Sequence, residues 1–286
     1  MPVTVTPIRY PGGKTKIYPL VREIIQVNSL QGGTYVEPFA GGAGLALKLL
    51  ARGDVEQIII NDADPAIYSI WHAIIFETRK LCDFISNVDV NIEEWKKQKE
   101  AYNNCCSEPS FELAKAAFFL NRTNISGVIT GGPIGGLDQK GTYKIDARFT
   151  KSTLIQKIGA IAEEKQQIKL YNLDVLDFMQ EILPSLEEKS LVYFDPPYVK
   201  KGSQLYKNAF SDNDHIRLKE KITSYERNWI VTYDVCELIN NLYSNYRGRY
   251  IDVRYSANGT KKAREYIFFS KRLKIPERLD MNEPTL

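Results

Sequence analysis

The segment "LVYFDPPY", Leu191 to Tyr198, begins as an apolar strand and ends in a carboxylate, two prolines and an aromatic ring. The exocyclic amine of adenine is a poor nucleophile because its lone pair is delocalised. Two acceptors that bind both amine protons favour a tetrahedral, nucleophilic nitrogen. Asp195 and the carbonyl of Pro196 can supply these acceptors in a turn that Pro197 helps to stiffen, and Tyr198 offers a face for stacking a base. These four residues are the candidate catalytic group.

A glycine-rich turn, "EPFAGGAG", lies between an expected strand and an expected helix. Gly41, Gly42 and Gly44 stand where the backbone must turn sharply and approach a ligand closely. Asp62 ends the next expected strand, near the spacing of about 20 residues at which an acidic side chain binds ribose hydroxyls. The combination predicts a nucleoside cofactor.

The sequence of this turn narrows the choice of cofactor. It lacks the G-x-G-x-x-G pattern of dinucleotide loops, and Glu37 precedes it. A nucleoside without phosphates fits better, and S-adenosylmethionine is the candidate because Glu37 and Asp62 would complement its cationic sulfonium and amino groups. The N-terminal "YPGGKTK" is no phosphate-binding loop, since that motif needs a glycine where the sequence has Ile8. Lys14 can instead bind a carboxylate such as the methionine end of the cofactor, or it is a solvated turn residue.

The composition limits the classes of protein to which the chain can belong. The chain has 286 residues, 43% of them hydrophobic, and a formal net charge of +3, which by itself does not indicate nucleic-acid binding. The four cysteines form no C-x-x-C pair and there are two histidines, so we expect neither a disulfide framework nor a metal site. The sequence shows no leader and no apolar run of about 18 residues, so we expect a cytoplasmic protein rather than a secreted or membrane protein.

The elements that must position these residues follow from periodicity. Strands and helices alternate, which favours a mostly parallel α/β sheet, and the last two strands flank a turn with Asn258 and Gly259, as in a hairpin. The expected strands include "QIIIND", "IKLYNLD", "LVYFD" and "WIVTYD", and the hairpin strands are "RYIDVRYSA" and "REYIFFSKR". The expected helices run from about Leu45 to Gly53, from Asp64 and Pro65 onward, from Lys151 to Glu164, up to Leu183, and from His215 to Tyr225.

The alternation is interrupted in the middle of the chain. Ile92 to Asn121 has the pattern of polar helices, and Gly127 to Gly141 is glycine-rich without an apolar period. We therefore predict one α/β domain, residues 1–65 and 151–286, that carries a mainly helical insert at residues 66–150.

In the order of its motifs the chain resembles the Dam-type (D12 class, alpha group) DNA adenine N6-methyltransferases. "RYPGGKTK" is similar to the N-terminal motif of that family, "VEPFAGGAG" to its cofactor loop, and "FDPPY" matches in full. "NDAD" is similar to the ribose-binding segment and "YNLDVLDF" to the segment near the cofactor adenine. The resemblance implies a Rossmann-like class I methyltransferase sheet. The cofactor contacts that it implies are Tyr10, Lys14, Glu37, Phe39, Gly41, Gly42, Gly44, Asp62, Asp174 and Asp195.

The insert would supply target recognition. "FFLNRTNISG" resembles the start of the family's recognition insert, often N-R-T-x-F-N-G, but Ile125 and Ser126 differ and "GGPIGG" departs from the commoner arrangement. The recognition sequence therefore stays open. Positively charged residues outnumber Asp138 and Asp146 in this region, which favours phosphate contacts. The candidate DNA-binding residues are Lys115, Asn121, Arg122, Asn124, Lys140, Lys144, Arg148 and Lys151.

Two further segments are weaker DNA candidates. "VKKGSQLYKNAFSDNDH", which follows the catalytic turn, would close around substrate. Lys261, Lys262 and Arg264 could add phosphate contacts, although a solvated turn is the simpler interpretation.

The sequence thus predicts a site-specific enzyme that moves a methyl group from S-adenosylmethionine to N6 of an adenine flipped out of double-stranded DNA. The alternatives are transfer to cytosine N4, whose enzymes more often have serine at the aspartate position, and a non-catalytic DNA-binding protein on the same scaffold. Methylation at cytosine C5 is disfavoured because no Pro-Cys pair supplies a thiolate. We expect a monomer, and whether a restriction endonuclease partner exists stays open.

Overall fold

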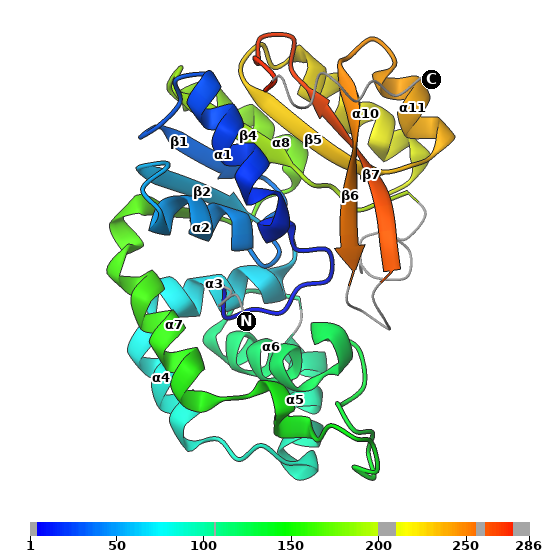
Figure 1. Cartoon of the computed structure of the whole chain (residues 1–286). Helices are drawn as coiled ribbons and strands as arrows, with labels where there is room; N and C mark the ends of the chain where they lie inside the picture. Colours follow the sequence, from blue (N-terminus) through cyan, green and yellow to red (C-terminus); the bar gives the residue numbers. More distant parts are fainter. Residues whose placement is uncertain (1–4, 106, 200–209, 256–260, 277–286) are drawn as a thin grey trace.

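The computed structural model describes residues 5–105, 107–199, 210–255 and 261–276. They form a seven-stranded sheet of order β3-β2-β1-β4-β5-β7-β6, flanked by helices (Figure 1). The strands are β1 (Thr34–Glu37), β2 (Gln57–Asn61), β3 (Ile168–Tyr171), β4 (Ser190–Phe194), β5 (Trp229–Asp234), β6 (Gly248–Tyr255) and β7 (Lys261–Phe269). The first five strands are parallel, and β7 runs antiparallel to both β5 and β6.

This topology confirms the predicted α/β sheet with a terminal antiparallel hairpin. The predicted turn residues Asn258 and Gly259 lie outside the described residues. Strand order changes direction at β1, which has β2 on one side and β4 on the other. In open α/β sheets a crevice forms at such a switch point, beyond the carboxyl ends of the strands. Glu37, Asn61 and Asp195 all lie at this edge, because each stands at or just after the end of β1, β2 or β4.

Helices cover both faces of the sheet. The α-helices are α1 (Tyr18–Val27), α2 (Gly44–Ala51), α3 (Pro65–Phe76), α4 (Thr78–Asn87), α5 (Ile92–Cys105), α6 (Phe111–Thr123), α7 (Lys151–Glu163), α8 (Val175–Glu181), α10 (Asp212–Ser224) and α11 (Glu237–Tyr243). The 3-10 helices are η1 (Lys14–Ile17), η2 (Ile125–Gly127), η3 (Ile145–Arg148), η4 (Lys165–Gln167) and η5 (Leu183–Ser185). No described helix has both the length and the apolar character needed to cross a membrane.

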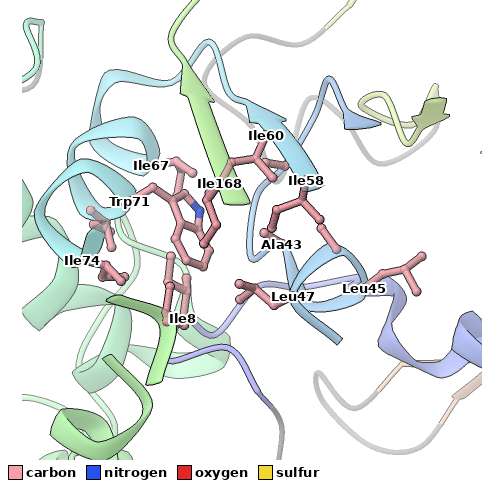
Figure 2. Packing of buried hydrophobic residues seen from close by; sticks show 14 of the residues in the cluster. Ile8, Ala43, Leu45, Leu47, Ile58, Ile60, Ile67, Trp71, Ile74 and Ile168 are labelled. Atoms are coloured by element: carbon pink, nitrogen blue, oxygen red, sulfur yellow. The ribbon is translucent and has the colours of Figure 1, made fainter. Parts of the chain in front are cut away.

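Strand residues alternate between two apolar clusters, as the pleat requires. Ile58 and Ile60 pack with α1, α2 and α3 on one face, whereas Ile59 packs with α8, α10 and α11 on the other. In Figure 2, Trp71 of α3 lies among isoleucines that include Ile8 of the N-terminal segment and Ile168 of β3. The N-terminal segment is thereby anchored in the core beside the crevice.

The middle of the chain, α4 to α6, packs against α3 and α7 at one end of the sheet (Figure 1). Helix α5 is polar, as expected. The expectation of a polar α6 was wrong: this helix packs between α3 and α5, and Leu113, Phe118 and Phe119 on it are buried in the same cluster as the sheet. Because the cluster is continuous, the division of the chain at residues 66 and 150 stays a prediction.

Three helices were not predicted from the periodicity of the sequence: α1, α4 and α11. Two of them carry the expected signal, since Val21 and Ile24 in α1, and Leu81 and Ile85 in α4, are buried at helical spacing. Helix α11 is only seven residues long, which is too short for periodicity to separate it from a loop.

Candidate active site

Asp195 follows the wholly buried strand β4 and lies at the centre of a polar cluster. Lys14 donates to its Oδ2 at 2.7 Å, and Thr232 of β5 donates to its Oδ1 at 2.9 Å. The hydroxyl of Tyr198 lies 3.4 Å from the same Oδ1. The predicted carboxylate partner of Lys14 was part of the cofactor, whereas the ammonium group here binds a carboxylate of the protein itself.

The hydrogen bond from Thr232 to Asp195 also fixes the direction of a second hydrogen bond, between Thr232 and Tyr193. The hydroxyls of Thr232 and Tyr193 are 2.8 Å apart in the core. Because the single hydroxyl proton of Thr232 points to Asp195, the Tyr193 hydroxyl must donate to Thr232. Tyr193, Thr232 and Asp195 thus form a directed chain that holds the carboxylate. Thr232 was not predicted, because every residue of β5 is buried and nothing in its sequence indicates which of them lies next to the end of β4.

The proline turn is held to β5 at a second point. Asp234, the last residue of β5, accepts a hydrogen bond from the backbone N–H of Val199 at 3.1 Å. Pro196 is buried, and the ring of Tyr198 is half-buried with the Lys14 ammonium 5.1 Å from its centre. Burial, followed by the negative charge of Asp195, raises the pKa of Tyr198 well above its ordinary value, so this side chain stays a neutral phenol.

Glu265 of β7 completes this cluster and was also missed by sequence reasoning. Its side chain is buried, and its Oε2 lies 3.8 Å from the Lys14 ammonium. Lys14 therefore lies between two carboxylates from strands that are far apart in the sequence. Glu265 follows Arg264 in a strand that begins with charged residues, so nothing in its local sequence indicates that it is buried.

The glycine turn is shaped by a hydrogen bond from the Gly41 N–H to Asp62 Oδ2 at 2.8 Å, which joins the ends of β1 and β2. Gly41 has a φ of +46°, and a Cβ there would lie 2.6 Å from the ring of Tyr10. A Cβ at Gly42 would lie 2.9 Å from Tyr10 Cβ, and one at Gly44 would lie 2.5 Å from the hydroxyl of Thr15. Sequence analysis expected a ligand to need this space, yet the N-terminal segment itself occupies it.

Two buried side chains hold the strand ends that form the crevice. Asn61 donates to the carbonyls of Pro38 and Leu173, at 3.0 and 3.1 Å, and accepts from Leu173 N at 2.9 Å, so it links the loops after β1, β2 and β3. Trp71 donates to the Gly41 carbonyl at 2.8 Å. Both contacts place the glycine turn, and neither residue was predicted.

Two acidic groups beside the turn have raised pKa values. Burial raises the pKa of Glu37 to about 8, although its Oε1 accepts from the N–H of Ala46 at 3.2 Å. Burial likewise raises the pKa of Asp62 to about 7, against the opposing hydrogen bonds from the backbone of Asp64 and Gly41. A buried carboxylate gains from a nearby cation, so this environment suits a positively charged ligand.

The remaining predicted cofactor contacts lie along the same edge. Phe39 packs edge-on against Phe210, with ring centres 6.1 Å apart. Asp174 is exposed and caps α8, accepting from the backbone of Leu176 at 2.8 Å. Its predicted contact with a cofactor stays a prediction.

The structure corrects the prediction for two of the DNA-binding candidates. Asn121 and Asn124 are 1% and 0% exposed, and both amides bond to backbone groups. Asn121 bonds to the N–H and the carbonyl of Arg9, and Asn124 donates to three carbonyls of the following loop, those of Val128, Ile129 and Gly131. In this arrangement neither amide is available to DNA, so we assign both a role in positioning their neighbours.

Arginines gather at the junction of the N-terminal segment and the insert. Arg122 donates to the carbonyls of Arg148 and Pro7, and burial with the charges of Arg9 and Arg148 lowers its pKa to about 9. Arg9, which was not predicted, donates to the carbonyl of Asn124 at 2.8 Å. A pocket of about 450 Å³ opens between Arg9, Arg148 and the exposed Tyr143. This positive region is suited to anions.

The predicted DNA-binding lysines are not among the residues that line this pocket. Lys115 pairs with Glu112 at 2.6 Å and Lys140 with Asp138 at 3.7 Å. Lys144 and Lys151 donate to the backbone carbonyls of Gln139 and Ser86, at 2.6 and 2.9 Å. Their contacts with DNA stay predictions.

The weaker DNA candidates are only partly covered by the structure. Residues 200–209 of the segment after the catalytic turn, and the side chains of Lys261 and Lys262, lie outside the described residues. Arg264 is exposed and lies 3.4 Å from Asp252.

Comparison with known proteins identifies the family of the chain. Residues 10–257 match the family described as D12 class N6 adenine-specific DNA methyltransferase. The type II methyltransferase M.MjaIII of Methanocaldococcus jannaschii is 25% identical over 74% of this chain and 76% of that protein. The retron Ec67 DNA adenine methylase of Escherichia coli is 25% identical over 93% of this chain and 91% of that protein. Among solved structures, the rRNA methyltransferase aviRa of Streptomyces viridochromogenes aligns with 92% of this chain and 86% of its own at 13% identity and a TM-score of 0.38.

The matched segment covers most of the chain and contains Lys14, Asp195, Thr232 and the glycine turn, whereas Arg9 and Glu265 lie just outside it. The chain belongs to the D12 class of N6 adenine-specific DNA methyltransferases.

Proposed function

We propose that this chain is a site-specific enzyme that methylates N6 of an adenine flipped out of double-stranded DNA. Membership of the family makes it a DNA adenine methyltransferase with S-adenosylmethionine as its cofactor. The observation that carries the finer proposal is the arrangement around Asp195: a carboxylate held by Lys14 and Thr232 at the edge of the sheet, beside the glycine turn. We expect the enzyme to act as a monomer.

The residues at this edge fit the cofactor. Burial raises the pKa values of Glu37 and Asp62, so both carboxyl groups would be stabilised by a positively charged ligand. We propose that Asp62 holds the ribose hydroxyls and that Glu37 stabilises the positive charge. When bound, the cofactor supplies an electrophilic methyl group on a sulfonium.

Asp195 is suited to accept a proton of the target amine. A carboxylate has about four acceptor positions. Two described residues donate to Asp195, Lys14 at Oδ2 and Thr232 at Oδ1, and the Tyr198 hydroxyl lies 3.4 Å from Oδ1. An acceptor position at Oδ2 therefore remains for the amine, and the Pro196 carbonyl would be the second acceptor. As the amine nitrogen gains its new bond it becomes positive, and Asp195 stabilises that charge.

The neutral ring of Tyr198 would support the flipped base by stacking. Removing a base from the duplex costs a few kcal/mol, which contacts with DNA must offset. We propose that the pocket between Arg9 and Arg148 contributes by binding a negatively charged part of the DNA.

The test is the Asp195→Ala variant, incubated with cofactor and unmodified genomic DNA. We expect N6-methyladenine formation to fall by about a hundredfold or more while cofactor binding, measured by calorimetry, is retained. Asp83→Ala removes an exposed aspartate of α4 and is the matched control. Single-molecule sequencing of the product identifies both the modified base and its sequence. Unchanged activity of Asp195→Ala, or N4-methylcytosine as the product, would refute the proposal.

A further inference from the structure

Glu265 is a buried carboxylate in strand β7 of the sheet. It is 1% exposed and stands in register with Asp234 of β5 on one side and Ile251 of β6 on the other. Burying a carboxylate in a sheet is costly unless a cation or several donors compensate for the lost water. Its position therefore needs a physical reason that packing alone does not give.

The compensating cation is Lys14, which Glu265 shares with Asp195. The ammonium nitrogen lies 2.7 Å from Asp195 Oδ2 and 3.8 Å from Glu265 Oε2, and Lys14 itself is 7% exposed. A side-chain hydrogen bond also joins Glu265 to Tyr198, whose hydroxyl lies 3.4 Å from Asp195 Oδ1. Glu265 thus contacts two of the groups that lie around the Asp195 carboxylate, Lys14 and Tyr198.

Because Asp195 and Glu265 share the Lys14 ammonium, Glu265 affects how strongly Asp195 can accept a further hydrogen bond. A cation that is paired with one carboxylate neutralises that carboxylate more fully than a cation that is shared by two carboxylates. If Glu265 were neutral, the Lys14 ammonium, which already lies 2.7 Å from Asp195 Oδ2, would be attracted to Asp195 alone and could turn a second N–H toward the acceptor position that the target amine needs. Buried charges interact strongly, so a small displacement of the ammonium group matters.

We propose that Glu265 is a positioning residue that shares the Lys14 ammonium with Asp195 and so keeps one acceptor position of Asp195 Oδ2 available to the target amine. Glu265 acts through the two residues that it contacts, Lys14 and Tyr198. The inference rests on the proposed function of Asp195 as the acceptor of the amine proton.

The test compares single-turnover methyl transfer in the wild type, Glu265→Gln and the control Asp252→Asn. Asp252 is an exposed acid of the neighbouring strand β6, so it controls for loss of a negative charge on the hairpin. We expect E265Q to slow methyl transfer about 10- to 100-fold, as loss of a supporting contact typically does, with the cofactor dissociation constant changed less than about threefold. The control should keep the wild-type rate.

A double-mutant cycle with Lys14→Met separates positioning from packing. If Glu265 acts through Lys14, E265Q should have little further effect on the rate once Lys14 is replaced. Glu265→Asp keeps the charge, so it should retain a higher rate than E265Q, and it remains informative if E265Q does not fold. Equal losses in Glu265→Asp and E265Q, or an equal effect of E265Q with and without Lys14, would overturn the inference. Absence of N6-methyladenine from the wild-type reaction would instead refute the proposed function.

Discussion

Asn121 binds the backbone of Arg9 through both atoms of its amide, at 2.9 Å to the N–H and 2.7 Å to the carbonyl. A second donation, to the Gly127 carbonyl at 2.9 Å, ties the same side chain to the loop after α6. One buried amide thus joins the N-terminal segment, which reaches the active site at Lys14, to the loop that borders the arginine pocket. An amide can donate and accept hydrogen bonds at the same time, so asparagine suits this position better than aspartate, which has the same shape but only accepts.

Replacement of Asn121 by Asp keeps the acceptor and removes both donations. The buried carbonyls of Arg9 and Gly127 would then lack partners, so we expect a loss of about 1–3 kcal/mol in the free energy of unfolding. DNA affinity should weaken with it, because Arg9 is no longer held. Urea unfolding and a DNA-binding titration measure the two effects, and Asn104→Asp, an exposed change in α5, is the control. Unaltered stability of Asn121→Asp would contradict the assigned role.

Thr232→Val removes the hydroxyl that orients Asp195 while keeping the shape of the side chain. The hydroxyl of Tyr193 also loses its acceptor, so we expect a stability cost of about 1–3 kcal/mol. Methyl transfer should slow about 10- to 100-fold, because Asp195 is no longer fixed. Thr232→Ser, which retains the hydroxyl, should keep most of the rate. If valine and serine behave alike in single-turnover assays, the hydroxyl does not orient Asp195.

Gly41→Ala tests whether the glycine turn makes room for Tyr10. Alanine at Gly41 would meet the ring at 2.6 Å and would also have to adopt a positive φ. Gly53→Ala is the matched control, since Gly53 has a φ of +69° but nothing within 4 Å of the added Cβ. We expect Gly53→Ala to cost about 1 kcal/mol in stability and Gly41→Ala clearly more, together with weaker cofactor binding. Thermal unfolding and calorimetry measure both, and equal costs at the two glycines would exclude a steric role of Tyr10.

Glu37→Gln should make stability less dependent on pH. Burial raises the pKa of Glu37 from 4.5 to about 8, so the folded chain binds this proton more tightly than the unfolded chain does. The free energy of unfolding therefore falls as pH rises from about 4.5 to about 8, and glutamine abolishes this contribution. We expect the variant to match the wild type near pH 5 and to exceed it by about 1–3 kcal/mol at pH 8.

The same substitution should weaken binding of the cationic cofactor, because the variant has no negative charge to offer. Chemical unfolding at several pH values would show the gain in stability, and calorimetric titration would show the loss of cofactor affinity. A variant less stable than the wild type at pH 8 would show that Glu37 is stabilised as a carboxylate, contrary to its raised pKa.

The sequence by itself determined the α/β fold, the terminal hairpin, the glycine turn and the D-P-P-Y segment. These features are local: a strand shows its period within a few residues, and Asp195 to Tyr198 are neighbours in the chain. The order and identity of these motifs were sufficient to indicate the family. Parallel strands end at a common edge, so the meeting of Asp62 and Gly41 could also be anticipated from strand order.

Only the tertiary structure decided what surrounds these motifs. Lys14 and Asp195 are 181 positions apart, and Thr232 and Glu265 reach them from β5 and β7 through strand pairings that no local pattern encodes. The same holds for Asn121, which sequence analysis assigned to DNA and which the structure buries against Arg9. A polar side chain has the same appearance in sequence whether it faces solvent, substrate or a distant backbone, because burial is set by long-range packing.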